Sequence, residues 1–238
     1  MPTTTPLKSV LLLSGGLDST VAAYMAQETT EPILALSFDY GQKARRRELA
    51  AAYALASRLG VPHRTVFLPF FSHLGSSALM EPGRDLPHPG HGELDDQAHA
   101  EASAAAVWVP NRNGIFIAVG AAWAEAQGAD VLVVGFNAEE ARTFPDNSVE
   151  FVLAQNDALG YSTRNAVQVI SPTATLDKRG IVAHAMAKDL PLEWVWSCYD
   201  GGDDPCGACE SCRRFDRAVE AAGASDWLDA RREKGSKS

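Results

Sequence analysis

The chain has 238 residues, of which 46% are hydrophobic and 21% are charged, a composition typical of a folded, soluble protein with room for one α/β domain and a small appendage. Its longest apolar runs, such as residues 115–124, are too short to span a bilayer, and residues 1–7 are polar, so we expect a cytoplasmic protein outside the membrane. The net charge of −9 argues against a nucleic-acid substrate, because a protein that grips nucleic acid by its phosphates usually presents a basic face.

Short apolar runs alternate with segments of helical periodicity along most of the chain. The apolar runs predict five buried strands, at residues 8–13, 33–38, 65–68, 131–134 and 167–170. The periodic segments predict helices at residues 20–27, 49–59, 115–127, 149–159 and 178–188. Strands that alternate with helices indicate an α/β fold, a Rossmann-like parallel sheet with helices on both faces.

Two regions depart from this alternation. Residues 72–106 are rich in Pro, Gly, His and acids, which predicts a mobile insertion or lid with a short helix at its Ala-rich end. A cluster of cysteines follows the last helix of the alternating part. We therefore divide the chain into a nucleotide-binding domain over 8–190, a cysteine-containing segment with a short helix (213–222) over 191–222, and a frayed polar tail over 223–238.

The first predicted strand ends at the segment Ser14–Thr20, which reads Ser-Gly-Gly-Leu-Asp-Ser-Thr and opens a helix. Adjacent glycines let consecutive backbone N–H groups form a concave anion-binding nest, and the N-terminus of a helix adds partial positive charge. The hydroxyls of Ser14, Ser19 and Thr20 can add further donors. Asp18 suits an anion site only if it caps the helix or holds a magnesium ion. A plain strand-to-helix turn is the alternative interpretation.

This segment matches neither the P-loop nor the dinucleotide-binding fingerprint. It resembles the pyrophosphatase loop (PP-loop) of the N-type ATP pyrophosphatases, enzymes with an adenine nucleotide alpha hydrolase-like fold. That resemblance implies that ATP is cleaved between its α and β phosphates and that AMP is transferred to a substrate, in contrast to the chemistry of a kinase.

All four cysteines of the chain lie close together, at Cys198, Cys206, Cys209 and Cys212. In a reducing compartment such a cluster suggests a metal site rather than disulfides. Four thiolates suit tetrahedral zinc and leave no open coordination position, so we expect a structural zinc site. An iron–sulfur cluster, free thiols and a disulfide stay open as alternatives. A zinc ribbon in a nucleic-acid-binding regulator is also an alternative.

Several motifs in a fixed order resemble the 7-cyano-7-deazaguanine synthase family of queuosine biosynthesis. They are Ser14–Thr20, Phe38-Asp39-Tyr40-Gly41-Gln42, Val109–Asn113, Gly135-Phe136-Asn137 and the cysteine cluster. The resemblance implies an ATP-dependent carbon–nitrogen ligase that adenylates the carboxylate of 7-carboxy-7-deazaguanine. Ammonia then displaces AMP to give the amide, and a second ATP activates the amide oxygen, so that loss of AMP leaves the nitrile. It also implies magnesium with ATP, and a homodimer. A different adenylating amidotransferase or a tRNA-modifying enzyme of the PP-loop superfamily is the alternative.

The resemblance implies roles for individual residues. Those that bind ATP are Leu13, Ser14, Gly15, Gly16, Leu17, Asp18, Ser19, Thr20, Phe38, Gln42 and Gly135. Those that act in catalysis are Asp18, Arg112 and Lys178, and those that contact the substrate include Asp39, Tyr40 and Asn113. Asn113 could also cap the following helix. Core packing for Phe38, a surface ion pair for Arg112 and a solvated side chain for Lys178 are the alternatives.

The segment Glu140–Asn147 departs from the family pattern. Better-known members have Asp-Tyr-Ser-Gly-Tyr-Pro-Asp-Cys where this chain has Glu-Ala-Arg-Thr-Phe-Pro-Asp-Asn. Here Phe144 could stack on a purine-like ring, and Asp146 or Glu150 could bind its guanine-type edge. A loop followed by a helix that begins near Asn147 is the alternative. The source of the ammonia is open, because a glutaminase domain does not fit in the chain.

Overall fold

The computed structural model describes residues 6–75, 77–90 and 92–235 of the chain. Five strands form one sheet: β1 (Leu7–Leu12), β2 (Thr30–Asp39), β3 (His63–Phe67), β4 (Val131–Val133) and β5 (Gln168–Ile170). The helices of the alternating part are α1 (Leu17–Gln27), α2 (Arg45–Leu59), α4 (Arg112–Gln127), α5 (Val149–Ser162) and α6 (Lys178–Ala187). The remaining helices are α3 (Gln97–Val107), α7 (Glu210–Ala221) and α8 (Ser225–Gly235).

The sheet is parallel throughout and has the strand order β3-β2-β1-β4-β5. The chain winds outward from β1 to β3 on one side and then resumes on the other side of β1 with β4. The order reverses between β1 and β4, and ligands of open α/β sheets bind beyond the carboxyl ends of the strands at such a reversal. The predicted parallel α/β sheet is confirmed, and the Ser14–Thr20 segment follows β1 at this point.

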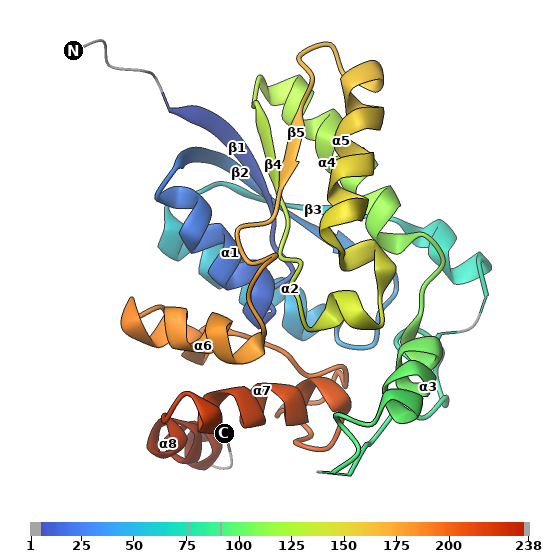
Figure 1. Cartoon of the computed structure of the whole chain (residues 1–238), viewed down its shortest axis with the longest axis vertical. Coiled ribbons are helices and arrows are strands. Elements are labelled where there is room, and N and C mark those ends of the chain that lie inside the picture. The colour runs from blue at the N-terminus through green and yellow to red at the C-terminus, as the bar shows by residue number, and fades with distance from the viewer. Residues whose placement is uncertain (1–5, 76, 91, 236–238) are drawn as a thin grey trace.

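Both faces of the sheet are covered by helices (Figure 1). Along β1 the side chains alternate: Val10 belongs to the core formed with α4 and α5, and Leu11 to the core formed with α1 and α2. Alanines on α1 and α2 let these helices approach the sheet closely. The period of two along a strand thus divides the apolar side chains between two layers of helices.

The C-terminal helices α6, α7 and α8 lie together beyond the sheet (Figure 1). They share a core with α1, to which Val21 of α1, Ile181 of α6, Phe215 of α7 and Leu228 of α8 contribute. The expectation of a frayed polar tail is wrong for residues 225–235, which form α8. Leu228 is buried, Trp227 packs against Phe215, and Arg231 lies over the Phe215 ring and donates to the carbonyl of Val195, so these three side chains dock the helix.

The region 72–106 carries the helix expected at its Ala-rich end, which is α3. Phe71, Ala78 and Leu79 are buried with Val107 in a core that adjoins the ends of β2 and β3. Short 3-10 turns occur at Pro69–His73, Glu140–Arg142, Pro145–Asn147 and Leu192–Trp194. None of the helices in the described ranges is long and apolar enough to cross a membrane.

Candidate active site

The Ser14–Thr20 loop connects β1 to α1 and forms the floor of the site. Gly16 is the N-cap of α1, in extended conformation and without a side-chain cap, so the first N–H groups of the helix stay available to a ligand. The hydroxyls of Ser14 and Ser19 lie 2.9 Å apart, and the Thr20 hydroxyl donates to the carbonyl of Gly16 over 2.7 Å. Thr20 therefore holds the loop from beneath, whereas Ser14 and Ser19 face outward.

Two glycines make the close approaches that this loop needs. Gly15 has a φ of +83°, and a Cβ atom there would lie 2.6 Å from the carbonyl oxygen of Glu48 on α2. At Gly135, just beyond β4, a Cβ atom would lie 2.5 Å from the backbone nitrogen of Ser19. Neither position can hold a side chain without displacing backbone. Gly135 therefore supports the loop from below.

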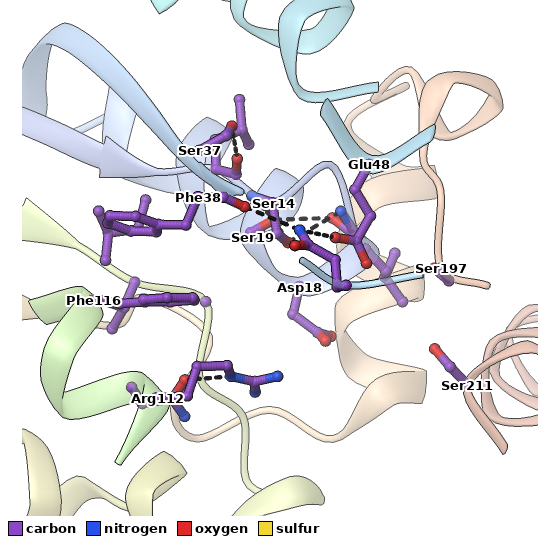
Figure 2. A pocket seen from close by; sticks show the side chains of 18 of the residues that line it. Ser14, Asp18, Ser19, Ser37, Phe38, Glu48, Arg112, Phe116, Ser197 and Ser211 are labelled. Atoms are coloured by element: carbon purple, nitrogen blue, oxygen red, sulfur yellow. Dashed lines mark hydrogen bonds between the residues drawn. The ribbon is translucent and has the colours of Figure 1, made fainter. Parts of the chain in front are cut away.

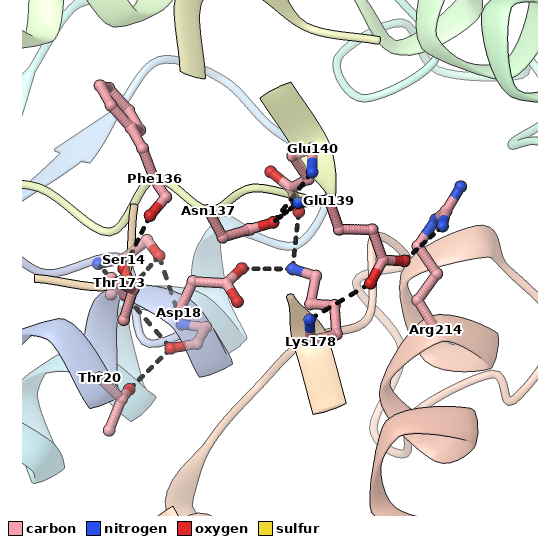
Figure 3. Close-up of polar contacts among 12 residues, drawn as sticks. Ser14, Asp18, Thr20, Phe136, Asn137, Glu139, Glu140, Thr173, Lys178 and Arg214 are labelled. Carbon is pink, nitrogen blue, oxygen red and sulfur yellow. Dashed lines mark hydrogen bonds and ion pairs between the residues drawn. The ribbon is translucent and has the colours of Figure 1, made fainter. Parts of the chain in front are cut away.

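Asp18 is joined to Lys178, which lies 160 positions later in the sequence (Figure 3). The ammonium of Lys178 donates to the Asp18 carboxylate, and to the carboxylate of Glu140 over 2.6 Å. Lys178 is buried, so it is no solvated surface lysine. The other Asp18 oxygen, Oδ1, is buried and has no hydrogen-bond partner in the described part of the chain. Asp18 does not cap α1, and it offers one oxygen to a ligand.

Burial and the three charges oppose one another in this cluster. Burial raises the pKa of Asp18 to about 6, and Lys178 only partly offsets this shift. Burial also disfavours the charged form of Lys178, but its two carboxylate partners outweigh burial and raise its pKa. The pKa of Glu140 lies below its usual value, because Lys178 outweighs the effect of burial. Lys178 is thus a cation at neutral pH.

Glu139, the neighbour of Glu140, fixes this cluster to α7 (Figure 3). Its carboxylate accepts from the backbone N–H of Lys178 over 3.2 Å and from the guanidinium of Arg214 over 2.6 Å. Arg217 donates to the same carboxylate over 3.1 Å. The start of α6 is therefore held in place by two arginines of α7.

A cavity of about 250 Å³ opens above the loop. Figure 2 shows the labelled side chains around it. Of the residues expected to bind ligands, those that line it are Leu13, Ser14, Gly16, Leu17, Asp18, Ser19, Phe38, Tyr40, Gln42, Arg112, Asn113, Gly135, Phe144 and Lys178. The expected residues outside the described lining are Gly15, Thr20, Asp39, Asp146 and Glu150. Glu150 is exposed on the first turn of α5.

One wall of the cavity is apolar and aromatic. The ring of Phe38 stacks on that of Phe116, with centroids 4.2 Å apart and planes at 16°. Phe38 is therefore both a core residue and part of the lining, and the two interpretations of it are compatible. An aromatic wall of this kind gives a purine a surface on which to stack.

Arg112 lies at the start of α4, one helical turn before Phe116 (Figure 2). It donates to the Tyr40 hydroxyl over 3.4 Å and forms no salt bridge with a described acid, so the alternative of a surface ion pair fails. Its guanidinium is available to a carboxylate or a phosphate. The expectation that Asn113 caps α4 is wrong: Asn111 is the N-cap, and Asn113 donates to the carbonyl of Asp146 over 3.3 Å.

The departing segment Glu140–Asn147 forms a rim of the cavity. Phe144 stacks in parallel with Trp108, with ring centroids 6.3 Å apart. Burial raises the pKa of Asp146, and Arg112 opposes this shift, which places Asp146 within the electrostatic reach of Arg112. The α5 helix begins at Val149 with Ser148 as its cap. The side chain of Phe144 lines the cavity at this rim.

The four cysteines converge beside α7. Their sulfur atoms all lie within 4.8 Å of one another. Four thiolates about 2.3 Å from one zinc ion would be about 3.8 Å apart in a tetrahedron. Backbone N–H groups of Asp200 and Cys206 each donate to the sulfur of Cys198 over 3.3 Å, which supports a thiolate. The residues present fit a metal ion.

Several lining residues were not anticipated from the sequence. They are Glu48 on α2, Glu140, Asn147, and the C-terminal residues Trp196, Ser197, Tyr199 and Ser211. The Ser197 hydroxyl is buried without a partner among the described residues. No local pattern marks these positions, although Ser197 and Tyr199 flank Cys198 and could have been linked to the site through it.

Comparisons with known proteins identify the family of this chain. The family model described as "Queuosine biosynthesis protein QueC" matches residues 8–223. A 7-cyano-7-deazaguanine synthase of Pelotomaculum thermopropionicum is 49% identical over 217 residues, covering 91% of this chain and 98% of the relative. The protein of the same name from Desulforudis audaxviator is 50% identical over 218 residues, covering 91% and 98%.

Among solved structures, the U34-tRNA thiolase NcsA from Methanococcus maripaludis, solved with its 4Fe–4S cluster, aligns with a TM-score of 0.50. It is 18% identical, and the alignment covers 95% of this chain and 68% of that one, which shows a shared fold alone. The family match spans most of the chain and includes the loop, the cavity and the cysteines. The chain therefore belongs to the queuosine biosynthesis protein QueC family.

Proposed function

We propose that this chain is an ATP-dependent ligase that converts 7-carboxy-7-deazaguanine and ammonia into 7-cyano-7-deazaguanine. A carboxylate resists nucleophiles, and adenylation turns one of its oxygens into a leaving group. Ammonia would then displace AMP to form the amide. A second ATP would activate the amide oxygen, and departure of AMP would leave the nitrile.

The observation that carries this proposal is one cavity lined both by a glycine-rich loop at a helix N-terminus and by Arg112, a guanidinium that forms no salt bridge with a described acid. The loop amides and Lys178 suit the phosphates of ATP, and Arg112 suits the carboxylate of the second substrate. An α-phosphate and a carboxylate can therefore meet inside it. The described lining includes no cysteine or histidine, which fits an intermediate carried on AMP rather than on the protein.

Phe144 and the acids near it would bind the deazaguanine ring. The Phe144 ring faces the cavity, and Asp146 lies beside Arg112. These residues occupy the segment that departs from better-known members of the family. Asp39 and Glu150 stay predictions as substrate contacts, because neither is in the described lining of the cavity.

We propose magnesium with ATP and zinc at the cysteines. The unpartnered Oδ1 atom of Asp18 is a suitable magnesium ligand, since this ion is usually bound by one or two carboxylates together with phosphates. When bound, it would offset charge on the departing pyrophosphate. The four sulfurs leave no open coordination position on a zinc ion, so that metal would stabilise the C-terminal segment.

The reaction consumes ATP, and the four thiols require a reducing compartment, so we place the protein in the cytoplasm. A homodimer stays a prediction from the family resemblance and is tested by light scattering.

The function is tested by incubating the protein with ATP, magnesium, ammonium and 7-carboxy-7-deazaguanine, followed by mass spectrometry. We expect the nitrile together with AMP and pyrophosphate. The protein should also convert the amide to the nitrile without ammonium. An Asp18→Asn variant serves as the inactive control. Formation of ADP and phosphate would contradict the adenylation mechanism.

A further inference from the structure

The cavity that would receive two anionic substrates is also lined by a carboxylate, Glu48, that forms no salt bridge among the described residues. ATP and the carboxylate substrate are both negatively charged, and the cavity meets them with Lys178, Arg112 and helix N–H groups. Asp18 and Glu140 are paired with Lys178. Glu48 also lines the cavity, but no salt bridge joins it to a cation in the described part of the chain. A buried carboxylate without a salt bridge is costly unless a positively charged ligand joins it or it takes up a proton.

The orientation of Glu48 is fixed by Gln42. The Gln42 side-chain oxygen accepts from the backbone N–H of Tyr40 over 3.0 Å, so its amide nitrogen must point the other way. That nitrogen donates to the carbonyl of Phe38 over 3.0 Å and to Oε2 of Glu48 over 2.9 Å. Every hydrogen-bonding atom of the Gln42 amide is engaged. Glu48 is thereby held with its second oxygen, Oε1, without a partner among the described residues.

Glu48 lies between the Ser14–Thr20 loop and Arg112. Its backbone carbonyl lies against Gly15 of the phosphate loop. Its side chain interacts electrostatically with Arg112 on α4 and with Tyr40 after β2, the titratable groups that face it. Figure 2 shows Glu48 and Arg112 on facing sides of the cavity. A mixed anhydride between the α-phosphate and the substrate carboxylate has to form between these groups.

We propose that Glu48 is the site that binds ammonium and takes a proton from it, an inference that rests on the proposed ligase function. Ammonia exists chiefly as ammonium at neutral pH, and ammonium has no lone pair with which to attack. The Glu48 carboxylate accepts one proton and leaves NH₃. The nitrogen lone pair forms a C–N bond with the adenylated carbonyl carbon, the C–O bond to AMP breaks with its electron pair on AMP, and the nitrogen releases a second proton to solvent.

The surroundings of Glu48 make it a stronger base than an exposed carboxylate. Burial raises its pKa, while the hydrogen bond from Gln42 and the charge of Arg112 oppose that shift. A carboxyl group with a raised pKa is a stronger base than an exposed one and can take up a proton more readily. The anionic form is present above that pKa, so base catalysis is lost as the pH falls through it.

The test compares Glu48→Gln with wild type in three assays. The first is ATP–pyrophosphate exchange with the acid substrate, which reports adenylation and needs no ammonium. The second is kcat/KM for total ammonium between about pH 7 and pH 8.5. The third replaces ammonium with hydroxylamine, whose conjugate acid is much more acidic, so that the nucleophile arrives neutral. Glu31→Gln, at an exposed position on β2, is the matched control.

We expect Glu48→Gln to retain exchange and the rate with hydroxylamine, and to lose about 10²-fold in kcat/KM for ammonium near pH 7. The wild type should show a plateau across this pH range. The variant should gain about tenfold per pH unit, because it depends on ammonia that is already neutral. A general structural defect would lower all three activities and would not produce this slope.

Other outcomes would overturn the inference. A plateau in the variant would show that Glu48 does not deprotonate ammonium. A raised magnesium requirement would make Glu48 a metal ligand, and a raised KM for the acid substrate in the exchange assay would make it a contact to the deazaguanine ring. If wild type itself shows no exchange, the ligase function fails. If wild type exchanges and the variant keeps the plateau, the role of Glu48 alone fails.

Discussion

The replacement of Lys178 by methionine should destabilise the protein in a way that depends on pH. Lys178 is the single described cation between Asp18 and Glu140, whose side chains are 16% and 31% exposed. Removing one partner of a buried ion pair costs about 3–5 kcal/mol. The partial exposure of Glu140 favours the lower end, so we expect a loss of about 3 kcal/mol near pH 8, or a fall in Tm of about 6–12 °C for a chain of this size.

The sign of the pH effect follows from Asp18. Its pKa is already raised to about 6 in the presence of Lys178, and it should rise further without the ammonium. The folded variant then binds a proton that the unfolded chain releases, so stability falls as the pH rises above the unfolded pKa of about 4. The destabilisation relative to wild type should therefore be greater at pH 8 than at about pH 5.5.

Urea unfolding of Lys178→Met and of the double variant Asp18→Asn/Lys178→Met measures this effect. The double variant should recover part of the stability, because it removes the unpaired charge, but it should not recover ATP turnover. A loss below about 1 kcal/mol that is the same at both pH values would refute the reasoning, since that is the behaviour of an exposed ion pair.

Three further predictions concern other parts of the site. Gly135→Ala should abolish ATP binding measured by calorimetry, because its Cβ would lie 2.5 Å from the Ser19 nitrogen. Gly160→Ala on α5 is the control, because the space around Gly160 is open. It should bind ATP normally and gain up to about 1 kcal/mol in stability. Cys206→Ser should lower both the zinc content by mass spectrometry and the Tm, and an unchanged zinc content would count against the metal site. Arg214→Gln, which breaks the 2.6 Å contact to Glu139, should raise the KM for ATP while zinc is retained; an unchanged KM would show that α7 does not position Lys178.

The strands and helices could be predicted largely because local sequence determines them. The run Val10–Leu13 is apolar on both faces, as a strand buried between two helical layers requires, and Gly60 ends α2 in the left-handed conformation. The helix expected at 213–222 begins earlier, at Glu210, because Cys209 and Cys212 occupy its cap and first turn. The pattern does not predict α8, because only Trp227 and Leu228 in it are large and apolar, and Arg231 docks through a contact to Val195 that the sequence does not reveal.

The Ser14–Thr20 loop could be predicted from the sequence, whereas the contacts that other segments make around the cavity could not. Ser14, Asp18 and Ser19 lie in one continuous motif, whereas the Asp18–Lys178 pair joins positions 160 residues apart. Glu48 carries no recognisable motif, and only the fold brings it beside Gly15 and opposite Arg112. Local periodicity contains no information on such contacts, so they emerge only from the packing of distant elements.

The central claim is that ATP adenylates the substrate carboxylate in the cavity above the Ser14–Thr20 loop. The most direct measurement uses 7-carboxy-7-deazaguanine labelled with ¹⁸O in its carboxylate, with mass spectrometry of the nucleotide products. Because both activated oxygens leave on AMP, the mechanism predicts that the label appears in AMP and is absent from pyrophosphate. Label in inorganic phosphate, accompanied by ADP, would contradict it.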